Sequence, residues 1–301
     1  MWFRNLQLYR LPAGWDVDVA TLDARLSAHA LAGCGAMDMQ SVGWLPPRDD
    51  ERFVYAFNGQ LLIAYGAEQK LLPATVVNQM AQDRAAQISE QEGRPVGRRE
   101  LRELKERVTD ELLPRAFVRR RTTFAWIDPV HGWLAVDAAA KTKAEEVMGQ
   151  LIKSVDELPA RLLKTHLSPG AAMTAWLESG EAPAGFTLDR DLELRAPGDE
   201  RATVRYVRHH LEGDEIRAHI AEGKQATRLA MTWNDRIAFV LTEDLQIKRL
   251  AFLDILKEES EGQAETDEER FEIDFALMSG ELAKLLEALV EALGGEMPAA
   301  S

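Results

Sequence analysis

The stretch of sequence that decides the fold is FVYAFNGQLLIAY, residues 53–65. Aromatic and aliphatic residues favour a strand on each side of Asn58-Gly59, the dipeptide best suited to the left-handed angles of a two-residue type I′ turn. The stretch therefore predicts an antiparallel hairpin with strands over residues 53–57 and 61–65.

The same pattern occurs twice more along the chain. Residues 122–127 and 133–137 form one pair of β-prone runs, and residues 227–233 and 236–242 form another. Residues 246–252 predict one further strand. Because short turns join neighbouring strands in the antiparallel sense, we expect mostly antiparallel sheets.

Helical sequence lies between the first two hairpins. Residues 75–92 and 98–113 are rich in Ala, Gln, Glu, Arg and Leu, and the intervening GRPVG, residues 93–97, predicts an elbow between two helices. Further helices are predicted over residues 141–154, 169–179, 214–222 and 271–293. Hairpins interrupted by helices, without regular alternation of strand and helix, are typical of the α+β class.

Residues 156–159 mark a candidate boundary between two halves of the chain. We expect an N-terminal α+β half, residues 1–157, that contains the helical pair at about 75–113. The C-terminal α+β half, residues 158–301, would contain a basic region at about 200–228 and a C-terminal helix.

The composition limits the class of protein. The 301 residues include 36 Lys and Arg against 50 Asp and Glu, a net charge of −14, and 46% of them are hydrophobic. So much apolar surface supports a core and excludes extended disorder. Arg4 and Arg10 interrupt the start of the chain, which predicts no secretory signal, and no stretch reaches the roughly 18 uncharged apolar residues of a membrane span. The single cysteine, Cys34, fits a reducing cytoplasm and predicts a small core residue.

The charge is unevenly distributed. Residues 94–121 contain ten basic and five acidic residues, a local charge of +5. At about 100° per residue on a helix, Arg98, Arg102 and Lys105 fall in one row beside an apolar stripe at positions 101, 104, 108 and 112. Such a row has the geometry to follow a phosphate backbone. The alternative is a solvated face with ion pairs at i,i+4 spacing, such as Glu103 with Arg107.

Further cations suggest an anionic partner. The triplet Arg119, Arg120 and Arg121 has no acid close by in the sequence, and a second group follows later: Arg201, Arg205, Arg208, His209, His210, Lys224, Arg228, Lys248 and Arg249. Charges beyond a Debye length of about 8 Å are largely screened. An acidic protein can therefore bind DNA if its cations line one concave face, while the acids outside disfavour attachment elsewhere.

Motifs for catalysis are missing from the sequence. There is no phosphate-binding GxxxxGK[ST] loop, GxSxG elbow, HExxH or CxxC. Of two nuclease-like acid-x-Lys pairs, Glu103 with Lys105 lies on a predicted helix, where the side chains point about 200° apart; the other is Glu68 with Lys70. His209, His210 and His219 lack the carboxylates or thiolates of a metal shell. We therefore expect no enzyme activity, cofactor or metal site, and a solvated loop and helix start over the acidic residues 258–274, which lack EF-hand spacing.

Several strings occur in a characteristic order over nearly the whole chain. They are WFRNL (2–6), YRL (9–11), GWLPP (43–47), LLPRAF (112–117), WID (126–128), LMSGEL (277–282) and LGGE (293–296). With these strings the sequence resembles the recombination-associated protein RdgC family of bacteria. The resemblance implies a homodimer closed into a ring by two separate contacts, whose positively charged hole encircles double-stranded DNA without reading its sequence. It also implies a cytoplasmic, nucleoid-associated protein that limits RecA recombinase by occupying the DNA.

The resemblance implies roles for individual residues. Phe117 would be the apolar contact that closes one side of the ring, whereas the alternative for this residue is an ordinary core aromatic. Arg94, Arg98 and Arg99 would be cations of the helical region near the hole. Arg208 and His209 would lie on a projecting finger, where a histidine stands in place of an amide and adds charge only below neutral pH.

The resulting prediction is a non-catalytic protein that binds duplex DNA without sequence preference and inserts into no membrane. The residues expected to contact DNA are Arg94, Arg98, Arg99, Arg102, Lys105, Arg115, Arg119, Arg120, Arg121, Arg205, Arg208, His209 and Lys224. Two alternatives stay open: a metal-dependent nuclease or DNA-processing enzyme, and an acidic protein-interaction module without direct DNA binding.

Overall fold

The structure is a computed structural model that describes residues 1–12, 14–15, 18–156, 158–198, 201–254, 256, 264 and 266–298. The acidic residues 258–274 lie partly outside this set, so the expected solvated loop is not described. The predicted α+β class with antiparallel sheets is confirmed.

The hairpin at the centre of the sequence is present. Strands β3 (Val54–Phe57) and β4 (Gln60–Leu71) pair antiparallel around Asn58 and Gly59, whose φ angles of 50° and 75° are those of a type I′ turn. β4 continues beyond its predicted end at residue 65, because it also pairs along its length with β5 (Phe117–Asp128), from Leu61 with Ile127 to Leu71 with Phe117.

The first sheet has the strand order β2-β4-β5-β6-β1-β7, with β3 also beside β4. The remaining bounds are β1 (Gln7–Arg10), β2 (Gln40–Leu45), β6 (Trp133–Val136) and β7 (Arg161–Leu162). Helices α1 (Val19–Ser27) and α4 (Lys141–Ser154) pack on this sheet, and their apolar residues share one core with Trp44 and Ile63. α4 has the predicted bounds.

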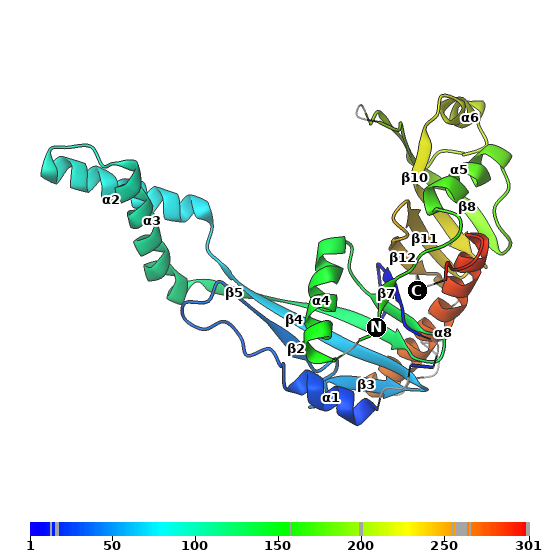
Figure 1. Cartoon of the computed structure of the whole chain (residues 1–301), viewed down its shortest axis with the longest axis horizontal. Helices are drawn as coiled ribbons and strands as arrows, with labels where there is room; N and C mark the ends of the chain where they lie inside the picture. The colour runs from blue at the N-terminus through cyan, green and yellow to red at the C-terminus, as the bar shows by residue number, and fades with distance from the viewer. Residues whose placement is uncertain are drawn as a thin grey trace.

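The far ends of β4 and β5 leave the sheet as an arm, residues 68–120, which carries α2 (Ala74–Glu92), α3 (Arg98–Leu112) and a 3₁₀ turn, η1 (Leu113–Arg115) (Figure 1). The predicted elbow ends α2 at Gly93, whose φ of 64° favours glycine. The two helices bury a small core of their own, made of Val77, Ala81, Leu104 and Val108.

A second sheet lies at the opposite end of the molecule, with the strand order β12-β11-β10-β8-β9. Its strands are β8 (Phe186–Arg195), β9 (Thr203–Tyr206), β10 (Gln225–Trp233), β11 (Ile237–Thr242) and β12 (Ile247–Phe252). Its helices are α5 (Pro169–Ser179) and α6 (Asp214–Ala221).

The C-terminal helix α8 (Asp267–Ala292) begins before the predicted residue 271. The reason is a capping box, in which Thr266 and Glu269 each accept a hydrogen bond from the other's backbone N–H. α8 joins the two halves of the chain, because Met278 and Leu282 share one core with Phe3 and Trp126 of the first half and with Phe239 of the second sheet. The boundary near residue 157 stays a prediction.

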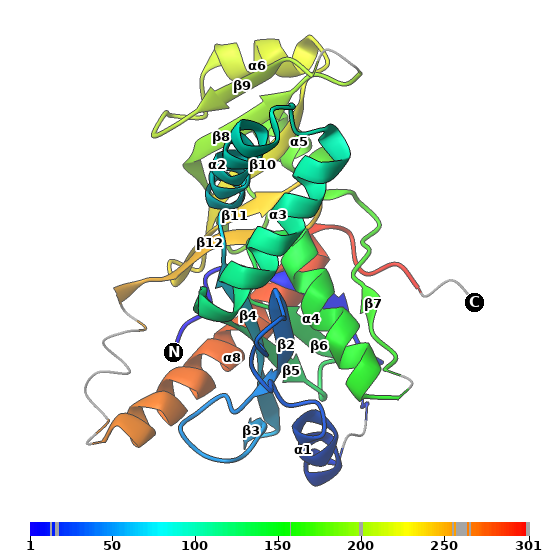
Figure 2. The same cartoon turned by 90° about the vertical axis from the view of Figure 1, so that its left-hand side faces the viewer.

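The molecule is curved, with the arm at one end and the second sheet at the other, on the same side of the first sheet (Figure 1). We call the space between them the hollow. Figure 2 looks across it from the arm, and strands of the second sheet are visible behind α2 and α3. Among the described residues, no helix is long and apolar enough to cross a membrane.

Candidate nucleic-acid interface

Helix α3 places its charged residues as the sequence predicts. Leu104 and Val108 of the apolar stripe are buried against α2, which leaves the basic row on the outside. In that row, Arg98 and Lys105 form no ion pair with another described residue, whereas Arg102 Nε lies 3.2 Å from Glu106 Oε1. An exposed i,i+4 pair contributes only about 0.3–0.5 kcal/mol, so a phosphate can replace Glu106 as the partner of Arg102.

The other cations near the elbow have acidic neighbours. Arg99 Nε lies 3.2 Å from Glu103 Oε1, and Arg94 lies between Glu92 and Glu100, at 2.7 and 2.9 Å. The hydrogen bond between Arg94 and Glu100 raises the pKa of Arg94 and lowers the pKa of Glu100. The ion-paired alternative therefore holds on α3 for Arg99 and Arg102, whereas Arg98 and Lys105 form no ion pair with a described residue.

The arginine triplet is divided by the strand that carries it. Successive side chains of a strand point to opposite faces, so Arg119 and Arg121 share one face of β5 and Arg120 takes the other. Arg120 Nη2 lies 2.6 Å from Oε1 of the buried Glu68, directly opposite on β4, and lowers the pKa of that carboxyl. The local sequence suggests that the triplet has no acidic partner. Arg120 nevertheless has one, because Glu68 lies 52 positions earlier in the chain, on the neighbouring strand.

Arg119 and Arg121 line a cleft of about 530 Å³ where the arm meets α4. Helix α4 contributes Lys143 and Lys153, and three glutamines complete the polar wall: Gln40, Gln69 and Gln150. Lys143 Nζ pairs with Glu146 at 2.9 Å and lies 4.9 Å from the centre of the Tyr65 ring. The two arginines and Lys153 form no ion pair within the described part of the chain, so this cleft carries excess positive charge.

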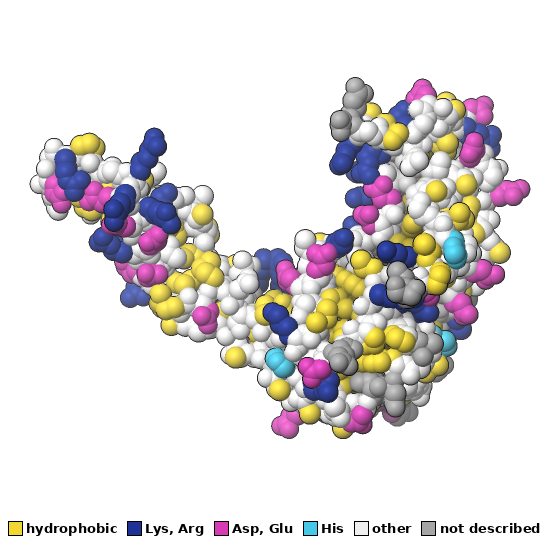
Figure 3. All heavy atoms as spheres, in the orientation of Figure 1, with side chains coloured by type: hydrophobic (Ala, Val, Ile, Leu, Met, Phe, Trp, Pro, Cys, Tyr) yellow, Lys and Arg dark blue, Asp and Glu magenta, His cyan; other side chains and the backbone are white. Residues whose placement is uncertain are grey.

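A second basic cleft, of about 360 Å³, lies on the second sheet, on the face away from α5 and α8. It is lined by Arg205, Arg228, Lys248 and Arg249 together with Asp191 and Glu193. Figure 3 shows that Lys and Arg side chains gather over the helical end of the arm and along the edge of the second sheet that borders the hollow. The basic surfaces thus come from segments that are far apart in the sequence.

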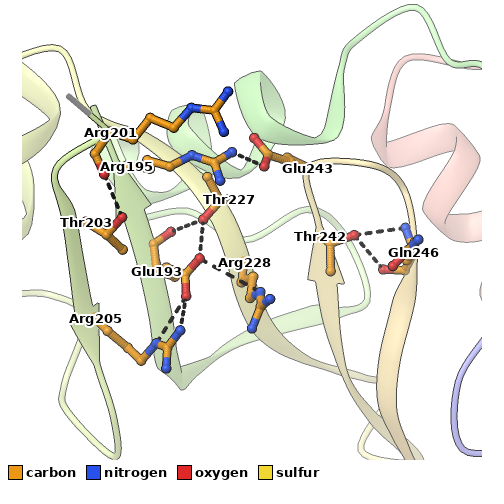
Figure 4. Close-up of polar contacts among 10 residues, drawn as sticks. All are labelled: Glu193, Arg195, Arg201, Thr203, Arg205, Thr227, Arg228, Thr242, Glu243 and Gln246. Carbon is orange, nitrogen blue, oxygen red and sulfur yellow. Dashed lines mark hydrogen bonds and ion pairs between the residues drawn. The ribbon is translucent and has the colours of Figure 1, made fainter. Parts of the chain in front are cut away.

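Glu193 organises this second cleft. The residue is only 8% exposed, and its carboxylate accepts hydrogen bonds from Arg205 and, at 3.0 Å, from the Thr227 hydroxyl (Figure 4). Arg228 Nε is more distant, at 3.9 Å from Oε1. Burial by itself would raise the pKa of Glu193. The hydrogen bonds and the two guanidinium charges have a larger, opposite effect, so the pKa is lowered overall. Glu193 is therefore a fixed anion that orients Arg205.

The remaining predicted cations are distributed around these surfaces. Arg208 donates its backbone N–H to Asp191, and its guanidinium has no partner among the residues described. His209 lies 3.6 Å from Glu215, and Lys224 Nζ lies 2.6 Å from Glu222, so both have acids beside them. Arg115 is exposed at the end of the arm helices.

Phe117 is not a core aromatic, because 83% of its surface is exposed. It pairs with Leu71 across the strands at the root of the arm helices, and Leu71, Val76 and Val118 are also exposed. An exposed apolar group of this kind marks a surface that another protein can cover.

Comparison with known proteins shows the family of the chain. The family model described as "Putative exonuclease, RdgC" matches residues 1–296. The chain belongs to the RdgC family. The recombination-associated protein RdgC of Janthinobacterium sp. (strain Marseille) is 55% identical over 297 residues, which is 99% of each chain. The protein of the same name from Dechloromonas aromatica (strain RCB) is 54% identical over 301 residues, again 99% of each.

Membership in the RdgC family confirms the resemblance seen in the sequence strings, but it does not by itself identify the basic clefts. Sequence reasoning missed Lys143 and Lys153, although Lys143, Glu146, Gln150 and Lys153 form a polar stripe at helical spacing opposite the apolar face of α4. The described residues hold no group of three or more His, Cys, Asp or Glu side chains arranged to bind a metal.

Proposed function

We propose that this protein binds double-stranded DNA without reading its sequence, as a homodimer that encircles the duplex and thereby limits RecA access during recombination. One observation carries the proposal. Cations without an ion-pair partner among the described residues come from three separate places: Arg98 and Lys105 on the arm, Arg119 and Arg121 in the cleft beside α4, and Lys248 on the second sheet. In a protein of net charge −14, such clustering favours a polyanionic ligand.

The chemistry of these groups suits the phosphate backbone. Lysine and arginine neutralise phosphates and release condensed counterions, so the logarithm of affinity falls with the logarithm of salt by about 0.9 per phosphate contacted. Such contacts position a duplex but carry no sequence information. Acids on the outer surface would disfavour binding elsewhere, which favours a duplex held in the hollow.

Closure into a ring would require a second copy of the chain. The exposed pair of Phe117 and Leu71 is the apolar surface from which we infer one of the two contacts. A closed ring would leave DNA only by opening a contact or by sliding off an end. Occupied DNA would then be inaccessible to RecA. Because the protein would be bound to chromosomal DNA, it would also be associated with the nucleoid.

Charge reversal on the arm tests the proposal. The double variant Arg98→Glu/Lys105→Glu should weaken binding to a short duplex at least tenfold and reduce the log-log salt slope by about 1.8, since two phosphate contacts are lost. Arg25→Glu/Arg52→Glu, on α1 and just before β3, makes the same change of charge at the end of the first sheet away from the hollow, and should alter neither quantity (Figure 1). Equal effects of the two variants would refute binding in the hollow.

The same proteins distinguish the alternatives. Cleavage or nicking of linear and supercoiled DNA in the presence of Mg²⁺ would instead support the nuclease alternative, which the description of the family model names. A wild-type protein that fails to shift DNA at low salt would support the protein-interaction alternative.

A further inference from the structure

Strand β12 contains an irregularity at the edge of the second basic cleft. Ala238 pairs with Ala251 and Val240 pairs with Lys248, so β12 has one more residue than β11 between these two pairs. The additional residue forms a β-bulge opposite Phe239. Its first residue, Arg249, has a φ of 52°, in the left-handed region that this type of bulge normally fills with glycine.

The bulge changes which side chains line the cleft. In a regular strand Lys248 would point outward and Arg249 inward, because side chains alternate between the two faces. Instead both residues line the cleft, and Leu250 returns to the buried face beside Ile247 and Phe252. Two adjacent cations therefore lie on one face without breaking the apolar side of the strand.

The folded chain offers little that would offset the strain at Arg249. A non-glycine residue with positive φ costs free energy, since Cβ approaches the following carbonyl. The Arg249 side chain is 76% exposed, and its guanidinium makes one ion pair, at 3.4 Å to Asp191. Its backbone N–H lies 3.5 Å from Asn5 Oδ1, at the limit of a hydrogen bond. An exposed ion pair of this length contributes little to stability, so glycine would be the more stable residue at this position.

The neighbours of Arg249 are also weakly compensated. Lys248 has no ion-pair partner in the described part of the chain, and Arg228 has its nearest carboxylate at 3.9 Å, on a Glu193 that already binds Arg205 and Thr227. Val240 forms an apolar wall of the cleft. The cleft thus presents three cations on one face of the sheet, around a volume of about 360 Å³.

We propose that Arg228, Lys248 and Arg249 form a phosphate-binding site for the DNA backbone, and that the strained bulge is kept because it turns Arg249 into this site. Non-glycine residues in left-handed conformations often occur at functional sites, where the surrounding structure holds them. The inference rests on the proposed DNA binding and adds to it a defined phosphate contact on the second sheet. It also commits the cleft to a phosphodiester of duplex DNA rather than to a free nucleotide.

Three substitutions at position 249 separate charge from strain. Arg249→Gly removes both, so it should weaken duplex binding about three- to tenfold, reduce the log-log salt slope by about 0.9, and raise the midpoint of urea denaturation. Arg249→Ala removes the charge and keeps the strained backbone, so it should weaken binding equally without raising the midpoint. Arg249→Lys keeps a cation and should retain most of the binding.

Ala251→Gly is the matched control, since it places glycine at an exposed, regular position of the same strand. It should lower the denaturation midpoint, because glycine in a regular strand loses more conformational entropy on folding. If the urea denaturation midpoint is lower in Arg249→Gly, as it is expected to be in Ala251→Gly, the backbone of Arg249 is not strained. If Arg249→Gly and Arg249→Ala both bind duplex DNA as the wild type does, Arg249 is not part of a phosphate site.

The arm variant Arg98→Glu/Lys105→Glu, measured alongside, distinguishes this inference from the proposed function. If the arm variant loses binding and the Arg249 variants do not, only the site on the second sheet is wrong. If the wild-type protein fails to bind duplex, the proposed function itself is wrong. Saturable binding of dAMP to the wild type that is lost in Arg249→Gly would assign the cleft to free nucleotides and overturn its assignment to the duplex.

Discussion

The arm and the second sheet both present cations, but they hold them in different ways. On the arm, the charged side chains extend from helices whose own core consists of four buried residues, and their ion pairs are exposed. On the second sheet, the cations surround a nearly buried Glu193, on strands that belong to the main core of the molecule. The arm can therefore adapt to a ligand, whereas the second sheet offers a preorganised surface.

The difference predicts two levels of stability within one chain. Local opening requires less free energy where few apolar contacts are buried, so the arm helices should open before the second sheet. Variants directed at each region test this expectation.

The largest effect is expected from a charge in the core of the arm. Val108 is fully buried between α2 and α3, so Val108→Asp places an unpaired carboxylate in an apolar site and should lower the local stability of the arm by about 3–5 kcal/mol. Hydrogen exchange followed by mass spectrometry should show loss of protection over α2 and α3 alone. Glu106→Asp, which puts the same side chain on the exposed face of α3, should leave protection unchanged. Loss of protection in the second sheet as well would show that the two regions unfold together.

A smaller effect is expected from the buried anion of the second sheet. Glu193→Gln should lower the free energy of unfolding by about 1.5–3 kcal/mol at pH 7, the usual contribution of hydrogen bonds to a charged group. Glu103→Gln on the arm removes an exposed pair and should cost less than about 0.5 kcal/mol. Urea denaturation of both variants measures the difference, and equal costs would contradict the contrast between adaptable and preorganised surfaces.

The effect of Glu193→Gln should depend on pH in a defined direction. The folded-state pKa of Glu193 is lowered, so its stabilisation is fully present above the unfolded pKa of about 4.3 and is lost as the pH falls through the lower folded value. The stability difference between wild type and variant should therefore shrink below about pH 4 in the same urea measurements.

The smallest effect on stability is expected at Phe117. Because this side chain is almost fully exposed, Phe117→Ala should change the free energy of unfolding by no more than about 0.5 kcal/mol. Sedimentation should nevertheless show weaker self-association, and the variant should leave a covalently closed circular duplex faster than the wild type does. Unchanged assembly would remove Phe117 from the proposed dimer contact.

Local sequence signals account for much of the fold. The turn at Asn58-Gly59 and the elbow at Gly93 each follow from a residue's own conformational preference, and both are present. The sequence did not predict the strands β1, β2, β7 and β8 or the helix α1, because short or mixed patterns become regular elements only beside the partners that pack with them. Helix α8 starts before the predicted residue 271, because the capping box of Thr266 and Glu269 stabilises its first turn.

The candidate site also contains parts that the local sequence predicts and parts that depend on contacts between distant segments. The basic row on α3 was predictable, since it depends on the periodicity of one helix. The cleft beside α4 was not, because Arg119 and Lys153 come from separate elements, and the pairing of β4 with β5 decides that Arg120 turns away toward Glu68.

By itself, the sequence of this RdgC family member determined its α+β class, its central hairpins and helices, and the excess of positive charge over residues 94–121, because these depend on neighbours along the chain. The tertiary structure alone decided which cations are neutralised, which have no ion-pair partner among the described residues, and which clefts they line. The physical reason is that an ion pair depends on distance in space, and both the partner of Arg120 and the bulge that turns Arg249 are set by strand register.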